Sequence, residues 1–303
     1  MKEITLGEML ENIRTDKNIS KVQLCEGVCT VTALTRYEQD IRVPDKFVID
    51  CLLERLGKNS NKIEFIDTDE EFRISMYRNQ IETLFFNREF LKVKEILDVY
   101  EKQINRSRHL HQQYICLKKG QLATIDGEYE YALELFQRAL SYTERLVIVE
   151  FGVEKRLLSN IEIEILYSLA EIYTKINEKN KSFFVVSELK GYLKDLEKNN
   201  VERIKYLPKI LLRLAEKEKD NFNFGLASSY LKEAEDILVK EYQISDLQKV
   251  LALQSEVAKQ LGIFDAETDN SDKILALKLI DMKDGMITKE GVELWENTAN
   301  LQL

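Results

Sequence analysis

The sequence predicts an all-α protein, and two observations lead to that prediction. Among 303 residues there are only 11 glycines and two prolines, too few of the residues that an all-β fold needs at its turns. Apolar residues recur with helical spacing along most of the chain, and short polar breaks such as Asp126-Gly127-Glu128 separate these patterns. The hydrophobic content of 44% is enough for a sizeable core.

The composition also excludes several kinds of protein. The longest stretch without a charged residue is Asn221–Leu231, far shorter than the roughly 20 apolar residues that span a bilayer. The first ten residues are acidic and mixed, so no secretory signal peptide is expected, and four cysteines form no disulfide framework. We therefore expect a cytoplasmic protein without a membrane partner. A net charge of −9 disfavours a chain coated in nucleic acid, but it allows a small DNA-binding module.

Residues 1–57 predict a bundle of four short helices. The first helix is expected over residues 6–17, and Ser20 is a favourable N-cap for the second. After a turn at residues 26–30, a third helix runs from about Val31 to Gln39. A fourth helix follows Pro44, with these residues directed inward: Phe47, Val48, Cys51, Leu52 and Leu56.

The second and third helices, joined by a turn, have the arrangement of a helix-turn-helix. The third helix exposes small polar residues and Arg36 around a buried Leu34. Small residues let a helix approach the major groove closely, and an arginine can reach a guanine or a phosphate. We expect the following residues to bind DNA: Ser20, Lys21, Thr30, Thr32, Ala33, Thr35, Arg36 and Arg42.

This segment resembles a known family. The order Arg14, Ser20, Glu26-Gly27-Val28-Cys29, Arg36-Tyr37-Glu38 and Pro44 is similar to the helix-turn-helix of peptide-sensing regulators of Gram-positive bacteria, the PlcR and Rgg type of the RRNPP superfamily. The resemblance implies that Arg14 pairs with Glu38. The sequence departs from the family at Lys21, where glutamine is usual, and at Asp40, where glycine is usual. Aspartate tolerates a left-handed turn, so we expect the fold to survive.

A second pattern recurs from about residue 68 onward. A small or apolar residue is followed by a small residue at +12, a large apolar residue at +16 and a small or apolar residue at +19, as in Gly120, Ala132, Phe136 and Ala139. Small residues let two antiparallel helices approach, and large ones fill the gaps between them. The pattern resembles tetratricopeptide repeats, with copies that start at these residues: Ile81, Gly120, Ala170, Ala215 and Ala258.

Together these patterns predict a helix-turn-helix bundle followed by a right-handed superhelix of tetratricopeptide-like helix pairs. We expect a DNA-binding domain in residues 1–60, a linker at 61–68, and a repeat domain in residues 69–303 that senses a ligand and mediates dimerisation. Such a superhelix has a concave face that suits an extended peptide. The inward positions of the first helices are these: Arg78, Glu82, Leu117, Gln121, Tyr167, Glu171, Leu212 and Glu216. None is an asparagine, although family members often hold a peptide backbone with asparagines.

No motif predicts catalysis, a metal site or a cofactor. Cys25 and Cys29 lie on either side of a turn with no second pair, so we expect small buried apolar groups rather than a zinc site. His109 and His111 are the only histidines, and we expect both on the solvated surface. Trp295 is expected to cover the end of the superhelix.

The predicted function is that of a cytoplasmic transcription regulator. It would bind a double-stranded DNA operator as a homodimer and respond to a short signalling peptide, as quorum-sensing receptors do. One alternative is a constitutive regulator whose repeat domain only dimerises or binds a protein partner. Another is a protein-interaction scaffold of the response-regulator-phosphatase kind, which the intact helix-turn-helix disfavours.

Overall fold

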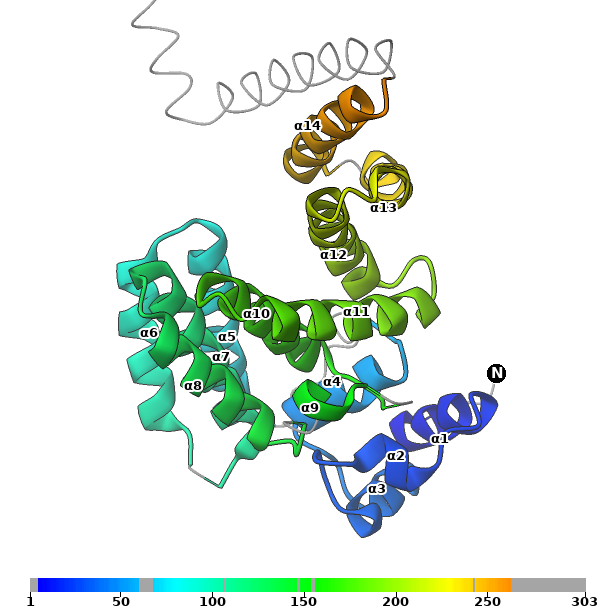
Figure 1. Cartoon of the computed structure of the whole chain (residues 1–303). Helices are drawn as coiled ribbons and strands as arrows, with labels where there is room; N and C mark the ends of the chain where they lie inside the picture. Colours follow the sequence, from blue (N-terminus) through cyan, green and yellow to red (C-terminus); the bar gives the residue numbers. More distant parts are fainter. Residues whose placement is uncertain are drawn as a thin grey trace, which may run out of the picture. The chain divides into compact units, whose positions relative to one another are not determined.

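The computed structural model describes residues 5–59, 68–105, 107–145, 148–153, 156–241 and 243–262. Every regular element in these residues is an α-helix, so the predicted all-α fold is confirmed (Figure 1). The chain divides into two compact units between Glu202 and Arg203. Within the described residues, no helix is both long enough and apolar enough to span a membrane. The predictions for Trp295 and for the helix after Ala258 lie outside the described residues.

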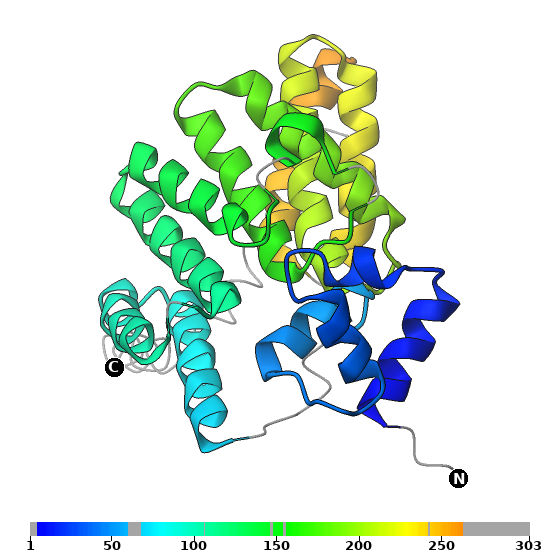
Figure 2. The ribbon, with the colours of Figure 1, turned by 90° about the horizontal axis from the view of Figure 1, so that it is seen from below.

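The N-terminal bundle contains the four predicted helices: α1 (Leu6–Asp16), α2 (Lys21–Cys25), α3 (Val31–Glu38) and α4 (Lys46–Arg55) (Figure 2). Ser20 caps α2 as predicted, and its hydroxyl and the Gln23 side chain form a capping box. The Thr30 hydroxyl caps α3 in the same way, by accepting a hydrogen bond from the Ala33 amide. Leu10, Leu24, Leu34 and Leu52 are fully buried at the centre of the bundle.

Asp40 stands at a position where the family that the bundle resembles usually has glycine. Its φ of 54° lies in the left-handed region, as predicted. Its carboxylate accepts hydrogen bonds from the Gly7 amide at 3.0 Å and from the Thr5 hydroxyl. A Cβ on Gly7 would lie only 2.4 Å from the Tyr37 carbonyl oxygen, so the start of α1 and the end of α3 approach closely. Asp40 therefore supplies a contact to α1 that a glycine could not.

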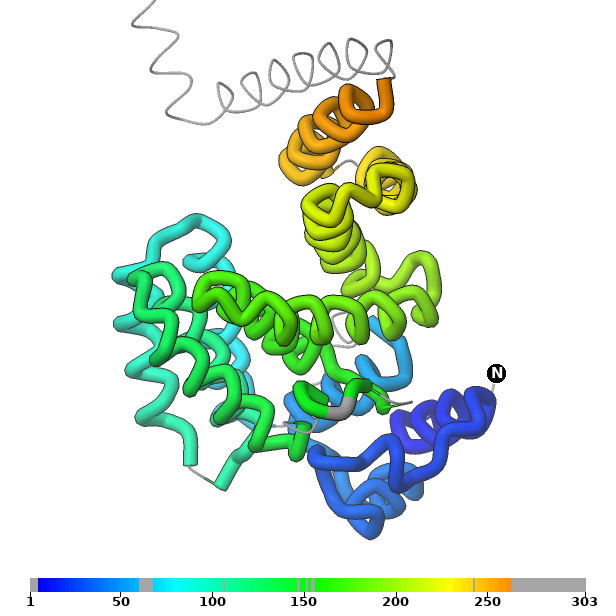
Figure 3. The backbone as a smooth tube through the Cα atoms, in the orientation of Figure 1, coloured from blue at the N-terminus to red at the C-terminus, as the bar shows by residue number. Residues whose placement is uncertain are grey.

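The first unit continues with antiparallel helix pairs (Figure 3). The pairs are α5 (Asp69–Phe86) with α6 (Phe90–Gln103), α7 (His109–Asp126) with α8 (Tyr129–Ser141), and α10 (Asn160–Lys175) with α11 (Lys179–Asp195); the short α9 (Ile148–Phe151) precedes α10. Gly120 faces Phe136 so closely that an added Cβ would lie 2.6 Å from the ring. The predicted rule of small residues against large ones is therefore confirmed at this pair.

The fourth predicted pair is also present. It consists of α12 (Val201–Asp220) and α13 (Phe224–Lys240), and α14 (Ile244–Gln260) packs on α13. The four positions that define this repeat, Ala215, Ala227, Leu231 and Ala234, are all fully buried. Most of this pair and all of α14 belong to the second compact unit.

His111 does not lie on the solvated surface, so the prediction was wrong for this residue, and His109 is partly covered. His111 is 5% exposed, and its Nδ1 lies 2.6 Å from the Tyr100 hydroxyl in a hydrogen bond. His109 is half-buried, and its Nε2 is 3.1 Å from the Gly27 carbonyl oxygen of the N-terminal bundle. His109 contacts Gly27 and His111 contacts Phe47, both far away in sequence, so local sequence patterns could not predict these contacts.

Candidate ligand groove and DNA-reading surface

A groove of about 750 Å³ lies between helices of the first unit. Its side chains come from α5, α7, α8 and α10, and α7, α8 and α10 pack on one another. The polar residues of its lining that matter most are Glu82, Lys118, Gln121, Glu164 and Glu171. The apolar part of the lining includes Phe85, Phe86, Ile125 and Phe136. Its volume is in the range of cavities that hold small ligands or a few residues of a peptide.

Lys118 organises the polar part of the groove. Its side chain is 2% exposed, and its ammonium lies 2.9 Å from Glu82 and 3.1 Å from Glu164. Burial would lower the pKa of Lys118, but Glu164 and Glu82 more than offset that effect, so the pKa lies above its ordinary value. Lys118 therefore remains an ammonium and ties α7 to both α5 and α10.

Neutral donors complete this arrangement. The Gln121 amide nitrogen donates to Glu164 Oε1 at 2.6 Å, and the Tyr114 hydroxyl donates to Glu82 Oε1 at 2.8 Å. The two glutamates are thereby held in fixed positions at the edge of the groove. A preorganised carboxylate loses little entropy when it receives a ligand, which favours binding.

The structure places the predicted inward residues in three different surroundings. Glu82, Gln121 and Glu171 line the groove. Leu117 is fully buried in the core, so it cannot contact a ligand. Leu212 and Glu216 belong to the second unit and are half-buried and exposed, respectively.

Arg78 and Tyr167 also fall outside the lining of the groove. Arg78 contacts the N-terminal bundle instead, because its guanidinium stacks over the Phe47 ring at 4.1 Å and lies 3.9 Å from Asp50. Tyr167 is half-buried. In α5, α7 and α10, the predicted residue nearer the C-terminus therefore lines the groove, and the predicted residue one turn before it does not.

The predicted DNA-reading residues lie on or beside α3. Thr32, Arg36 and Arg42 are exposed, and Ala33 and Thr35 are half-buried. The hydroxyls of Ser20 and Thr30 cap α2 and α3. Exposed Thr32 and Arg36 are one helical turn apart, so they share a face that could enter a major groove.

Lys21 is oriented differently from the prediction. Its ammonium lies 2.8 Å from Glu38 and 3.3 Å from the Thr35 hydroxyl, so it serves the interior of the bundle. The predicted pair of Arg14 and Glu38 is confirmed, with Arg14 Nε at 2.6 Å and Nη2 at 3.2 Å from the two carboxylate oxygens. Burial would raise the pKa of Glu38, but Arg14 and Lys21 lower it below its ordinary value. Lys21 thus supplies a second cation for this buried carboxylate.

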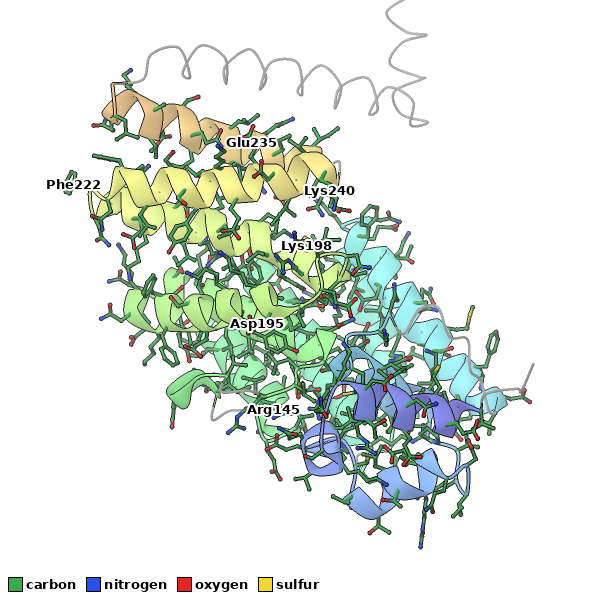
Figure 4. The ribbon with its side chains drawn as sticks, turned by 90° about the vertical axis from the view of Figure 1, so that its right-hand side faces the viewer. Arg145, Asp195, Lys198, Phe222, Glu235 and Lys240 are labelled. Carbon is green, nitrogen blue, oxygen red and sulfur yellow. The ribbon has the colours of Figure 1, made fainter. Side chains whose placement is uncertain are left out.

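A buried ionic network joins the N-terminal bundle to the repeats. Arg55 of α4 donates to both oxygens of Glu162 on α10, at 3.0 and 3.3 Å. Arg145, which is labelled in Figure 4, donates to Glu162 at 3.2 Å and to Glu26, in the turn between α2 and α3, at 2.7 Å. The side chains of Arg55, Arg145 and Glu162 are fully buried. The N-terminal bundle therefore packs firmly on the first repeats and does not form a compact unit of its own.

A second contact between the same parts is aromatic. The Phe47 ring of α4 meets His111 edge-on with centroids 4.7 Å apart, and Tyr114 with centroids 6.4 Å apart. Gly27 provides a third contact, because a Cβ at this position would lie 2.3 Å from the Thr143 carbonyl oxygen. Three separate contacts therefore fix the bundle against α7, α10 and the segment after α8.

Sequence reasoning missed Lys118, Glu164 and the arginine network. Lys118 follows the apolar run Tyr114–Leu117, and Glu162 and Glu164 alternate with isoleucines. A charged residue at a helix position expected to be apolar was therefore the available sign of a buried ionic contact. No group of three or more His, Cys, Asp or Glu side chains in the described part of the chain is arranged to hold a metal ion.

Comparison with known proteins supports the fold. No family model matches the sequence, and no curated protein matches it. A solved structure of PlcR from Bacillus thuringiensis, in complex with the peptide PapR7 and DNA, matches with a TM-score of 0.53 at 15% identity, and the match covers 95% of this chain and all of that one. The chain shares the fold of PlcR. The BtubC structure from P. vanneervenii matches with a TM-score of 0.51 at 14% identity, and covers 71% of this chain and 92% of its own.

The PlcR match extends over both the helix-turn-helix bundle and the helix pairs, since it covers nearly the whole chain. The BtubC match covers a smaller share of this chain. The order of a helix-turn-helix bundle and tetratricopeptide-like pairs, as predicted from the sequence, is therefore that of PlcR.

Proposed function

We propose that this protein is a DNA-binding transcription regulator whose activity is controlled by a short peptide bound in the groove between α5, α7 and α10. The observation that supports this best is that one helix, α10, contributes to both sites. Glu162 of α10 holds the N-terminal bundle through Arg55 and Arg145, and Glu164 and Glu171 of α10 line the groove. A ligand that displaces α10 would therefore change how the DNA-reading bundle is held.

Control by a peptide requires two states of the protein. The state in which Glu162 holds the N-terminal bundle is one of them. A ligand shifts an equilibrium between two states only by as much as it binds one state better than the other. Glu164 belongs to a hydrogen-bonded cluster with Lys118 and Gln121, so a peptide that competes for it would perturb α10 directly. We propose that this competition favours a different placement of the N-terminal bundle.

The DNA-binding half of the proposal rests on the exposed face of α3. Thr32 and Arg36 are exposed. On the opposite side of α3, Leu34 and Tyr37 pack into the hydrophobic core and hold the helix in place. We propose that two copies of the chain read an inverted repeat, because helix-turn-helix proteins commonly bind as dimers to half-sites one helical turn apart. The protein would act in the cytoplasm.

Selection from a random duplex library tests the DNA half. The full chain should enrich an inverted repeat, and the Arg36→Ala variant should not. A thermal-shift screen against peptides secreted by the source organism tests the ligand half, and at least one peptide should raise the melting temperature and change operator affinity. Enrichment of DNA without any responsive peptide would favour the constitutive alternative, in which the repeats only dimerise. Failure to enrich any sequence would favour a scaffold.

A further inference from the structure

The charges of the groove indicate which kind of peptide would occupy it. Among the described residues of its lining, the charged side chains are Glu82, Glu164, Glu171 and Lys118. Three carboxylates and one ammonium give the groove a formal charge of −2. Because Lys118 already contacts Glu82 and Glu164, its single charge is shared between two of the three glutamates.

The acidic part of the groove already surrounds one cation, the Lys118 ammonium. Lys118 Nζ lies 5.2 Å from the centre of the Phe85 ring and 5.4 Å from that of Tyr114, so this corner already holds one ammonium between carboxylates and aromatic faces. Glu171 lies on α10 two helical turns after Glu164, further along the same groove. Glu171 therefore adds a third carboxylate to the acidic part of the lining.

Two apolar residues of the lining are exposed. Phe86 is 88% exposed and Ile125 is 49% exposed, yet both border the groove. Large exposed apolar side chains beside a polar pocket mark contact sites for a partner. An apolar side chain of the ligand would cover them.

We propose that the occupant is a short cationic peptide, which presents an ammonium or guanidinium to the carboxylates of α10 and an apolar side chain to Phe86 and Ile125. This inference rests on the proposed function, because it assumes that the groove holds a peptide. The carboxylates exclude an acidic peptide, since like charges in a partly enclosed groove repel. The cation could be a basic side chain or a free amino terminus.

Four heptapeptide mixtures provide the probes. Three are acetylated and amidated, have lysine, glutamine or glutamate at the centre, and contain uncharged residues elsewhere. The fourth has glutamine at the centre and a free amino terminus. Fluorescence anisotropy with the full-length protein should give at least tenfold tighter binding for the lysine mixture than for the glutamine mixture, and no binding for the glutamate mixture. Tighter binding of the fourth mixture than of its acetylated counterpart would identify the amino terminus as an additional source of the cation.

Two matched pairs of variants locate the binding. Glu171→Gln should weaken binding of the lysine mixture at least fivefold and leave the glutamine mixture within twofold, whereas Glu134→Gln, an exposed change on α8 outside the groove, should alter neither. Phe86→Ala should weaken the lysine mixture, and Leu91→Ala, at a 79% exposed position on α6, should not.

The outcomes separate this inference from the proposed function. If the glutamine or glutamate mixture binds as tightly as the lysine mixture, the cationic preference is wrong and peptide sensing still stands. If none of the four mixtures binds, both are wrong.

Discussion

Glu162 and Glu164 lie two positions apart on α10 and face different surroundings. Glu162 is fully buried between Arg55 and Arg145, whereas Glu164 is 20% exposed in its side chain and contacts Lys118 at the groove. Residues two apart on a helix do not share a face. The same short segment therefore connects the candidate ligand site to the contact that holds the N-terminal bundle.

Removing the charge of Glu162 should destabilise the first unit. Glu162→Gln leaves Arg55 buried without a carboxylate partner and leaves Arg145 with Glu26 alone, and breaking a buried pair costs about 3–5 kcal/mol. Urea denaturation would measure the loss. Glu134→Gln, at an exposed position of α8, is the control and should change the free energy of unfolding by less than about 0.5 kcal/mol. Equal stability of the two variants would show that the network contributes nothing.

Arg14→Ala should lower the melting temperature of the N-terminal bundle. Arg14 is 8% exposed and donates twice to Glu38. Because Lys21 remains as a partner of Glu38, we expect the lower end of the range of about 3–5 kcal/mol for breaking a buried pair. Arg42→Ala changes an exposed arginine and serves as the control. The pairing would have no structural role if both variants melted together.

Arg36→Ala should abolish specific operator binding and leave the fold intact. Arg36 is exposed on the last turn of α3, and a bidentate contact to a base is worth roughly 1–3 kcal/mol. Gel shifts with the selected operator and with a scrambled duplex would measure affinity and preference. Retention of the wild-type preference would mean that α3 does not read the major groove.

Two glycine substitutions should have opposite effects. Gly120→Ala places a Cβ 2.6 Å from the Phe136 ring, and such overpacking costs about 1–3 kcal/mol. Gly191→Ala, in the interior of α11, meets nothing within 4 Å and should stabilise by roughly 0.5–1 kcal/mol, because alanine loses less backbone entropy in a helix. Thermal denaturation of both variants checks the sign. A stabilising Gly120→Ala would contradict the close approach of α7 and α8.

Stability should decline in mild acid through His111. Burial, Arg78 and Arg108 lower its pKa to about 3 from the ordinary 6.5. The unfolded chain therefore binds a proton that the folded chain does not, so the stabilisation is complete above pH 6.5 and is lost as the pH falls toward 3. We expect roughly 1 kcal/mol less stability per pH unit between pH 6 and pH 5. His111→Phe should flatten this slope, and an unchanged slope would assign it to other groups.

Local signals were enough for the elements of the fold. The Ser20 cap, the buried Leu34 and the facing of Gly120 and Phe136 follow from spacing within one helix or between two adjacent ones. The groove was only partly predictable. Leu117, which was predicted in the lining, lies in the core, and the only local sign of the polar cluster was a charge such as Lys118 at a helix position expected to be apolar.

The contact between bundle and repeats could not be predicted from local patterns. Arg55 and Glu162 are 107 residues apart in sequence, and neither belongs to a sequence motif from which the other could be predicted as its partner. Likewise, His111 has a polar side chain but is buried in contact with Phe47 and Tyr100. Such contacts depend on tertiary packing, which overrides the local preference of each residue.

The arginine network also limits how the N-terminal bundle can be moved to another protein. A helix-turn-helix domain is often treated as an independent unit that can be fused to a new sensor domain. Here Arg55 and Glu26 would leave half of a salt-bridge cluster behind if residues 1–60 were moved alone. The transferable piece is the bundle together with Arg145 and Glu162, so chimeras joined after α11 should keep the salt-bridge cluster, whereas those joined after α4 should not.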